Sequence, residues 1–183
     1  SKKLKEDLLA KYNVDSVDDL PVNFRGIVAQ YSEGRQAKVL NEFAETRMSE
    51  ELEQAQIARQ FGWLSPTVAV RSISTILAGT SLETHHRFLR EAETLRLEFV
   101  QALNKVHAEK LDYKLDMNRN ASEEAADKAV VGADNWAILA EFDFKPEAGS
   151  TRISNALIYF IQLLLWMGLT ALLLQAAVRN LNP

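Results

Sequence analysis

The sequence predicts an all-α protein, an elongated helical hairpin or small bundle that is followed by one C-terminal transmembrane helix. Two observations predict this fold class. Apolar residues recur three or four positions apart over residues 22–62 and again over 82–113, and this is the period of an α-helix. Residues 156–178 then contain no charged side chain at all, which is typical of a helix that crosses a lipid bilayer.

The first part of the chain is predicted to form several helices. A short helix over residues 4–12 precedes the long helix over 22–62. Ser65 and Pro66 are a good cap and first-turn pair for a third helix, and Gly79 is expected to end it. The chain therefore folds back on itself at least twice before residue 82.

The helix over 82–113, capped by Thr80 or Ser81, has the clearest repeat in the chain. Its apolar residues follow a heptad pattern, in which Phe88, Leu95 and Ala102 alternate with Ala92, Phe99, Val106 and Tyr113. Such a stripe needs another long helix to pack on, so we expect antiparallel pairing with the helix over 22–62, which Gly34 could interrupt.

Polar residues dominate the segment 112–135, which predicts a loop that contains a short helix capped by Ser122. Its carboxylates are interpreted as solvated charges, namely Asp112, Asp116, Glu123 and Glu124. The next segment carries Trp136, Ile138, Leu139, Phe142 and Phe144 toward the predicted span. Alternation over 140–144 favours a short strand, whereas aromatic residues ahead of a span favour an interfacial segment, and both interpretations stay open here.

Arg152 and Arg179 bracket the uncharged segment, which as a helix would be about 35 Å long and would cross a hydrocarbon core of about 30 Å. The predicted domains are a helical domain at 1–152, a transmembrane helix at 153–179 and a tail at 180–183. One face of the span carries Asn155, Tyr159, Gln162, Trp166 and Thr170. Because an amide in a bilayer normally bonds to a neighbouring helix, we expect this face to pack on other transmembrane helices.

Composition argues against several classes of function. The net charge is −4 and no dense basic cluster is visible, so the chain lacks the surface with which proteins bind nucleic acids. It has no cysteine, which excludes disulfides, thiolate zinc sites and cysteine nucleophiles. None of its seven glycines belongs to a Gly-x-x-x-x-Gly-Lys motif, so this chain is not expected to be an ATPase or to hold a cofactor.

Glu83 and His86 form a Glu-x-x-His pair of the kind that holds metal ions in four-helix carboxylate proteins. Such a site needs a second copy, and the remaining histidine at 107 has Asn104 rather than a carboxylate three residues earlier. Metal binding is therefore disfavoured, and His85 and His86 are interpreted as surface or capping residues at a helix start.

One stretch of the chain, residues 62–104, reads GWLSPTVAVRSISTILAGTSLETHHRFLREAETLRLEFVQALN. It resembles the region before the last span of certain ABC-2-type transporter permeases that carry a large helical insert. The residues that carry the likeness form a corner between two helices, and they are Pro66, Ala69, Leu77, Ala78, Gly79, Thr80, His86 and Phe88. The stretch DDLPVNFRGI at 18–27 is also similar to that family.

The resemblance implies a non-catalytic part of the permease of an ABC exporter in the bacterial cytoplasmic membrane, with residues 1–152 outside the cytoplasm. It implies a second permease subunit, a separate ATPase subunit that binds ATP, and further spans of the permease as partners, with the insert guiding substrate or an accessory protein. Since such permeases have several spans, the chain is interpreted as a C-terminal part of one. The alternative is a single-pass, membrane-anchored helical interaction module.

Overall fold

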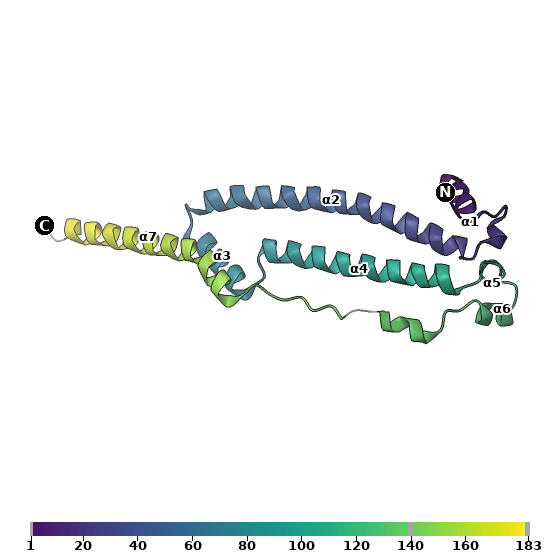
Figure 1. The fold of residues 1–183 in the computed structure, drawn as a ribbon. Coiled ribbons are helices and arrows are strands. Elements are labelled where there is room, and N and C mark those ends of the chain that lie inside the picture. Colours follow the sequence, from purple (N-terminus) through teal and green to yellow (C-terminus); the bar gives the residue numbers. More distant parts are fainter. Residues whose placement is uncertain (1, 139–140, 182–183) are drawn as a thin grey trace. The chain divides into compact units, whose positions relative to one another are not determined.

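A computed structural model describes residues 2–138 and 141–181 of the chain, and these residues form helices joined by turns and irregular segments (Figure 1). No strand occurs among them, so the predicted all-α class is confirmed. The elements are α1 (Lys2–Tyr12), the 3₁₀ turn η1 (Val17–Asp19), α2 (Phe24–Gly62), α3 (Pro66–Ala78), α4 (Leu82–Lys110), α5 (Tyr113–Met117), α6 (Glu123–Lys128), the 3₁₀ turn η2 (Ala133–Ile138) and α7 (Gly149–Leu181).

Several helix ends are shifted by two to four residues from the sequence-based expectation, and two further differences have a clear physical cause. Helix α2 continues through Gly34, where a Cβ atom would meet only a glutamine side chain at 3.6 Å, so nothing requires a break. The helix expected over 82–113 ends at Lys110, because the Asp112 carboxylate accepts hydrogen bonds from the backbone N–H groups of Lys114 and Leu115 at 2.9 and 3.0 Å. Asp112 is exposed, as expected of a solvated charge, and it also caps a new helix, α5.

The segment before α7 does not form the strand that alternation favoured. Residues 141–148 have no regular secondary structure. The side chains of Trp136 and Ile138, residues 139–140 and the tail residues 182–183 lie outside what the structure describes. The Phe144 ring packs edge to face on Phe88, with ring centroids 5.3 Å apart.

The chain divides into two compact units, one formed by residues 1–43 and 91–142 and the other by 44–90 and 143–183. In the first unit, α2 and α4 approach so closely that a Cβ atom on Gly26 would lie 2.5 Å from the backbone nitrogen of Ala108. Farther along the same pair, the amides of Gln30 and Gln101 each donate to the other's backbone carbonyl, at 3.4 and 3.0 Å. The predicted antiparallel packing of these helices is therefore present in this unit.

In the second unit, α2 and α4 are joined by polar pairs. Arg90 donates two hydrogen bonds to the Glu45 carboxylate at 2.6 and 2.7 Å. Arg59 donates to Glu83 at 2.6 Å. These bonds join the end of α2 to the start of α4, and α3 and α7 complete the unit.

The apolar core of the described residues is small. Its buried apolar side chains are mostly alanines, namely Ala37, Ala69, Ala108, Ala129 and Ala156, with Met48 and Leu111. Many large apolar side chains are exposed instead, on α2, on α3 and along most of α7. Exposed apolar surface of this extent is typical of a protein that contacts lipid or other chains.

Candidate functional site

The first candidate site is the contact of α7 with the turn between α2 and α3, which we call the corner (residues 61–65). Gln162 of α7 is 2 % exposed, and its Nε2 donates to the carbonyl oxygen of Gly62 at 2.9 Å and to that of Ser65 at 3.5 Å. Carbonyls at the end of a helix lack partners within the helix, so the end of α2 offers acceptors to a side chain. Gln162 bonds to the last carbonyl of α2, at Gly62, and to the carbonyl of Ser65, which precedes α3, and it thereby ties α7 to the corner.

A second side chain of α7 also reaches the corner. Trp166 Nε1 donates to the carbonyl oxygen of Trp63 at 3.1 Å. At the other end of α3, Arg152 Nη1 donates to the carbonyl oxygen of Leu77 at 2.8 Å. Helix α3 is therefore attached to α7 near both of its ends, and it runs antiparallel to α7 between Gln162 and Arg152.

The contact between α3 and α7 depends on small side chains. Ala69 of α3 and Ala156 of α7 are both fully buried. Small residues let two helix backbones approach closely, which is the packing mode that membrane helices favour. Ala69 belongs to the sequence motif, and Ala156 is one helical turn after Arg152.

The other predicted face residues have different roles. The Thr170 hydroxyl donates to the carbonyls of Trp166 and Met167 in its own helix. Asn155 is exposed and Tyr159 half-buried, and both line a cavity of about 230 Å³ together with Arg59 and Glu83. Within the described residues, Gln162 and Trp166 therefore bond to the chain's own corner. Packing of this face of α7 on further transmembrane helices stays a prediction.

The motif residues that follow α3 form its end and the start of α4. Gly79 has a left-handed backbone with φ of 70°, and the Thr80 N–H donates to the carbonyl of Thr75 at 2.9 Å. Helix α3 therefore ends at a glycine, and any residue with a Cβ atom at position 79 would be strained. The Ser81 hydroxyl then accepts from the Thr84 N–H at 3.3 Å and caps α4, as the sequence predicts.

The interpretation of His86 as a surface or capping residue was wrong. His86 is 1 % exposed, and its Nε2 donates to the Glu51 carboxylate of α2 at 2.9 Å, whereas His85 is exposed. Hydrogen bonds from His86 and then from Arg47 lower the pKa of Glu51. His86 thus joins α4 to α2, and its buried Nδ1 has no hydrogen-bond partner among the residues that the structure describes.

Glu83 and His86 do not share a site, because each has a different partner on α2. Glu83 pairs with Arg59: burial alone would raise the pKa of Glu83, but hydrogen bonds from its own backbone and from Arg59 outweigh burial and lower it. His86 pairs with Glu51. No group of three or more histidine, aspartate or glutamate side chains that could hold a metal ion occurs within residues 2–138 and 141–181.

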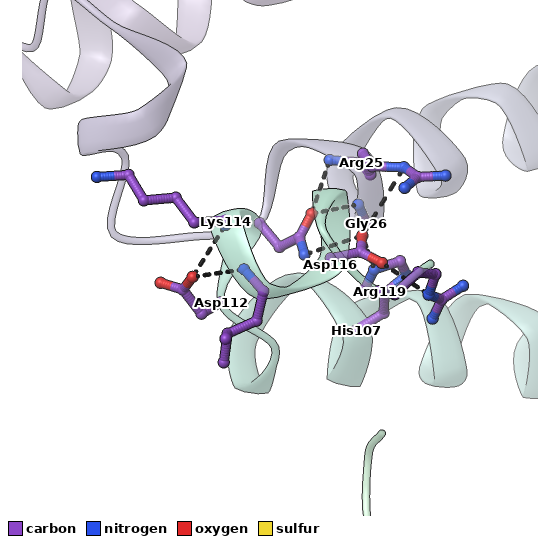
Figure 2. A network of polar contacts seen from close by, with 9 residues as sticks. Arg25, Gly26, His107, Asp112, Lys114, Asp116 and Arg119 are labelled. Carbon is purple, nitrogen blue, oxygen red and sulfur yellow. Dashed lines mark hydrogen bonds and ion pairs between the residues drawn. The ribbon is translucent and has the colours of Figure 1, made fainter. Parts of the chain in front are cut away.

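The second candidate site is a network around Asp116 of α5, drawn in Figure 2. Asp116 is 0 % exposed, so its interpretation as a solvated charge was wrong. Its Oδ2 accepts from His107 Nε2 at 2.9 Å and from Asn23 Nδ2 at 3.2 Å. The cationic side chains of Arg25 and Arg119 lie 3.8 and 3.5 Å from its oxygens.

The Asp116 network joins three elements of the first unit. Asn23 caps α2 by accepting from the N–H groups of Arg25 and Gly26, and its own N–H donates to the carbonyl of Ala108 at 2.7 Å. Burial alone would raise the pKa of Asp116, but hydrogen bonds from His107 and Asn23 and nearby positive charges outweigh burial and lower it. The carboxylate therefore stays ionised and holds α2, α4 and α5 together.

Sequence reasoning missed the Asp116 network because its members come from segments far apart in the chain. The spacing of nine residues between His107 and Asp116 fits neither a helix face nor a strand face. One local feature of the sequence could have indicated it. A capping aspartate at position 112 marks the end of the heptad helix and the start of α5, whose Asp116 then lies against that helix.

A protein-family profile described as "Domain of unknown function (DUF3526)" matches residues 1–145 of the chain. The match therefore covers α1 to α6 and ends before α7. No curated protein and no solved structure matches the chain.

Proposed function

Starting from the fact that the chain belongs to the family described as "Domain of unknown function (DUF3526)", we propose that it is a non-catalytic part of the membrane-spanning permease of an ABC-2-type exporter. In this proposal α7 crosses the membrane and residues 1–152 lie outside the cytoplasm. The family description assigns no activity, so the support comes from the residues of this chain.

One observation carries the membrane assignment. Helix α7 contains a segment, Gly149–Asn180, that is long and apolar enough to cross a membrane, with a mean hydropathy of 2.2, and only 6 % of its most apolar window is buried. A core helix of a soluble protein would be covered by other parts of the chain. Exposed leucines and isoleucines along a helix of this length are stable in lipid and costly in water.

The residues that join helices in the second unit support a role in transmitting movement rather than in catalysis. The residues that resemble the permease family, such as Pro66, Gly79 and His86, begin or end helices or join them to each other. None of them forms an arrangement of nucleophile and base. Helix junctions that link a helix in the membrane to helices outside it can pass a movement from one to the other.

The proposed partners follow from the fact that a single transmembrane helix cannot enclose a transport path. A transport path needs several helices around it, so α7 would act beside other spans of the permease and a second permease subunit. ATP would be bound by a separate ATPase subunit, and its binding would move the spans. The helices outside the membrane would then guide the substrate or an accessory protein.

The first test is purification of the chain from its native membranes in mild detergent. We expect an ATPase subunit to remain bound through the purification, and mass spectrometry of the eluate identifies it. Recovery of the chain without any nucleotide-binding protein would contradict the exporter proposal.

A second test uses the absence of cysteine, because one introduced cysteine gives a unique label. In intact cells, Ala121→Cys should react with a maleimide that cannot cross membranes, and Asn180→Cys should react only after the membrane is opened. Equal labelling of both positions would show that α7 does not separate two compartments.

A second candidate function is a membrane-anchored helical interaction module. It is favoured by an exposed apolar patch in the first unit, formed by Val39, Leu40 and Phe43 of α2, which could contact another protein. This alternative predicts purification with a protein that is not an ATPase, through the α2 patch. Substituting Phe43 with Ser would then abolish that contact, whereas the exporter proposal expects ATPase association to survive the same change.

A further inference from the structure

One groove of the second unit is lined by basic and hydroxyl side chains. It is about 560 Å³ in volume and lies among the end of α2, the side of α3 and the start of α4. Its lining includes Arg59, Arg71 and His85 together with hydroxyl groups of Ser72, Thr75 and Ser81, but no carboxylate. We call it the basic groove. In a chain with a net charge of −4, such a lining indicates a site for an anion.

Two of its basic side chains have no competing acceptor. Among the residues that the structure describes, neither the Arg71 guanidinium nor the His85 ring has a hydrogen-bond partner. Arg59 is held in place by Glu83 at 2.6 Å, which fixes its direction. Planar guanidinium groups bind phosphate oxygens through paired N–H groups, so phosphate is the anion that this set fits best.

The position of the groove along α7 follows from the bonds at the two ends of α3. Helix α3 lies beside α7 between Gln162, bound near Ser65, and Arg152, bound to Leu77. Arg71 is midway along α3, and it is therefore level with about residue 157 of α7.

The length of α7 places this level in the headgroup layer. When the uncharged residues 153–155 are counted together with 156–178, the helix between Arg152 and Arg179 spans about 39 Å, which exceeds a hydrocarbon core of about 30 Å by about six residues. With Arg179 at one edge of the core, the opposite edge lies near residue 159. The basic groove is then just outside the core, where phosphate groups of lipids lie.

The corner beside Trp166 lies deeper by the same measure, and its side chains suit that depth. Phe61 is 71 % and Leu64 is 76 % exposed, and the Trp63 carbonyl is bonded to Trp166. The corner thus presents apolar side chains at the level of the acyl chains, and the basic groove presents cations at the level of the headgroups. Together they match the two parts of a phospholipid.

We propose that the basic groove binds the phosphate of an anionic phospholipid, whose acyl chains cover the exposed apolar side chains of the corner. This inference rests on the proposed insertion of α7 into a membrane. The bound lipid would hold α3 at a fixed depth, so that the corner and α7 move as one body.

The experiment titrates dioctanoyl-phosphatidylglycerol into the full chain in neutral detergent and follows the number of bound lipids by native mass spectrometry. We expect saturable binding that Arg71→Gln weakens about tenfold, the loss typical of one charge-assisted contact. Arg71→Lys should recover part of the affinity. The matched control is Arg35→Gln, which removes the same charge from an exposed site of the first unit and should leave the affinity unchanged.

Two further ligands identify the source of the phosphate. Dioctanoyl-phosphatidylcholine should bind more weakly, and inorganic phosphate at millimolar concentration should not displace phosphatidylglycerol. Displacement by inorganic phosphate at low concentration would overturn the lipid assignment in favour of a site for free phosphate. If Arg71→Gln and Arg35→Gln weaken the affinity for phosphatidylglycerol equally, the effect is one of net charge. That result would refute a binding site in the basic groove.

A separate measurement distinguishes failure of this inference from failure of the proposed function. If alkaline carbonate washes the chain from its membranes, α7 is not inserted and both proposals fail. If the chain stays in the membrane and Arg71→Gln binds phosphatidylglycerol as tightly as the unaltered chain, only the lipid site is refuted.

Discussion

Each of the two units contains a buried polar side chain that ties helix ends together, and the two side chains differ in their chemistry. In the first unit the group is the Asp116 carboxylate, surrounded by a histidine, an asparagine and two arginines. In the second unit it is the neutral amide of Gln162, which donates only to backbone carbonyls. Burial of a charge is tolerated only with charged partners, whereas an amide needs only acceptors.

This difference fits the media that we propose around the two side chains, water around Asp116 and lipid around Gln162. A network of ionised groups is stable where water surrounds it and can solvate its outer arginines. At the level of lipid, charged groups are costly, and small residues and amides are the usual contacts between helices. The comparison therefore predicts that the two groups respond differently to substitution, to pH and to the lipid environment.

The largest effect is expected for Asp116→Ala. The change leaves a buried histidine and asparagine and two nearby arginines without their acceptor, so we expect a loss of about 3–5 kcal/mol in the free energy of unfolding. Urea denaturation of the full chain in mild detergent measures it. Asp127→Ala on exposed α6 is the control and should change stability by less than about 0.5 kcal/mol.

The same carboxylate predicts a dependence of stability on pH. The folded state lowers the pKa of Asp116 from its ordinary value of 3.8, so the stability it contributes is present above about pH 4 and is lost as pH falls through the lower folded pKa. In Asp116→Asn this contribution is absent at every pH. The difference in unfolding free energy between the two proteins should therefore shrink below about pH 4. A constant difference from pH 6 to pH 3 would contradict the role of the ionised carboxylate.

The next largest change in unfolding free energy is expected for Gly26→Ala. Comparison with a second glycine of the same helix distinguishes the effect of close packing from that of helix propensity. In Gly26→Ala the new Cβ would lie 2.5 Å from the backbone of Ala108, so α2 and α4 must move apart, and we expect a loss of about 1–3 kcal/mol. Gly34→Ala is the matched control on the same helix, with 3.6 Å to its nearest neighbour. It should instead gain about 0.5–1 kcal/mol, since alanine favours a helix. Urea denaturation distinguishes the two by the sign of the change.

For the second unit, Gln162→Leu tests whether the amide joins α7 to the corner. The change leaves the carbonyls of Gly62 and Ser65 with fewer donors, and we expect a loss of about 1–2 kcal/mol in detergent. The control is Gln175→Leu, at an exposed position farther along α7, which should be neutral. Crosslinking between cysteines placed on α3 and α7 reports the same contact directly. Unchanged crosslinking and stability would show that the amide face has no role in packing.

The sequence was sufficient where a structure depends on local patterns. The uncharged segment predicted α7, Gly79 predicted the end of α3, and Ser81 and Ser122 predicted the caps of α4 and α6. In each case the residue acts on its immediate neighbours in the chain. The transmembrane role, the domain assignments and the exporter function remain predictions.

The sequence was not sufficient where distant segments meet. His86 looked like a polar residue at a helix start, but it is buried because α2 supplies Glu51 from 35 positions earlier. Asp116 was missed for the same reason, since Asn23 is 93 positions away. Gln162 was recognised as a packing residue, yet nothing local indicated that its acceptors are the carbonyls of the α2–α3 turn. Burial of a polar group is decided by its partner, and a single sequence does not identify that partner.

The smallest effect concerns two serines that look alike in the sequence. Ser81 and Ser65 both precede a helix, but only the Ser81 hydroxyl accepts a hydrogen bond from the backbone, whereas Ser65 makes no side-chain cap. Ser81→Ala should therefore cost about 1 kcal/mol, and Ser65→Ala only a few tenths. Because the Ser65 carbonyl, rather than its hydroxyl, faces Gln162, its replacement also leaves the contact with α7 intact. If urea denaturation shows the same loss of unfolding free energy for both variants, Ser65 caps α3 in solution. The start of α3 would then be stabilised by its own cap more than by its contact with α7.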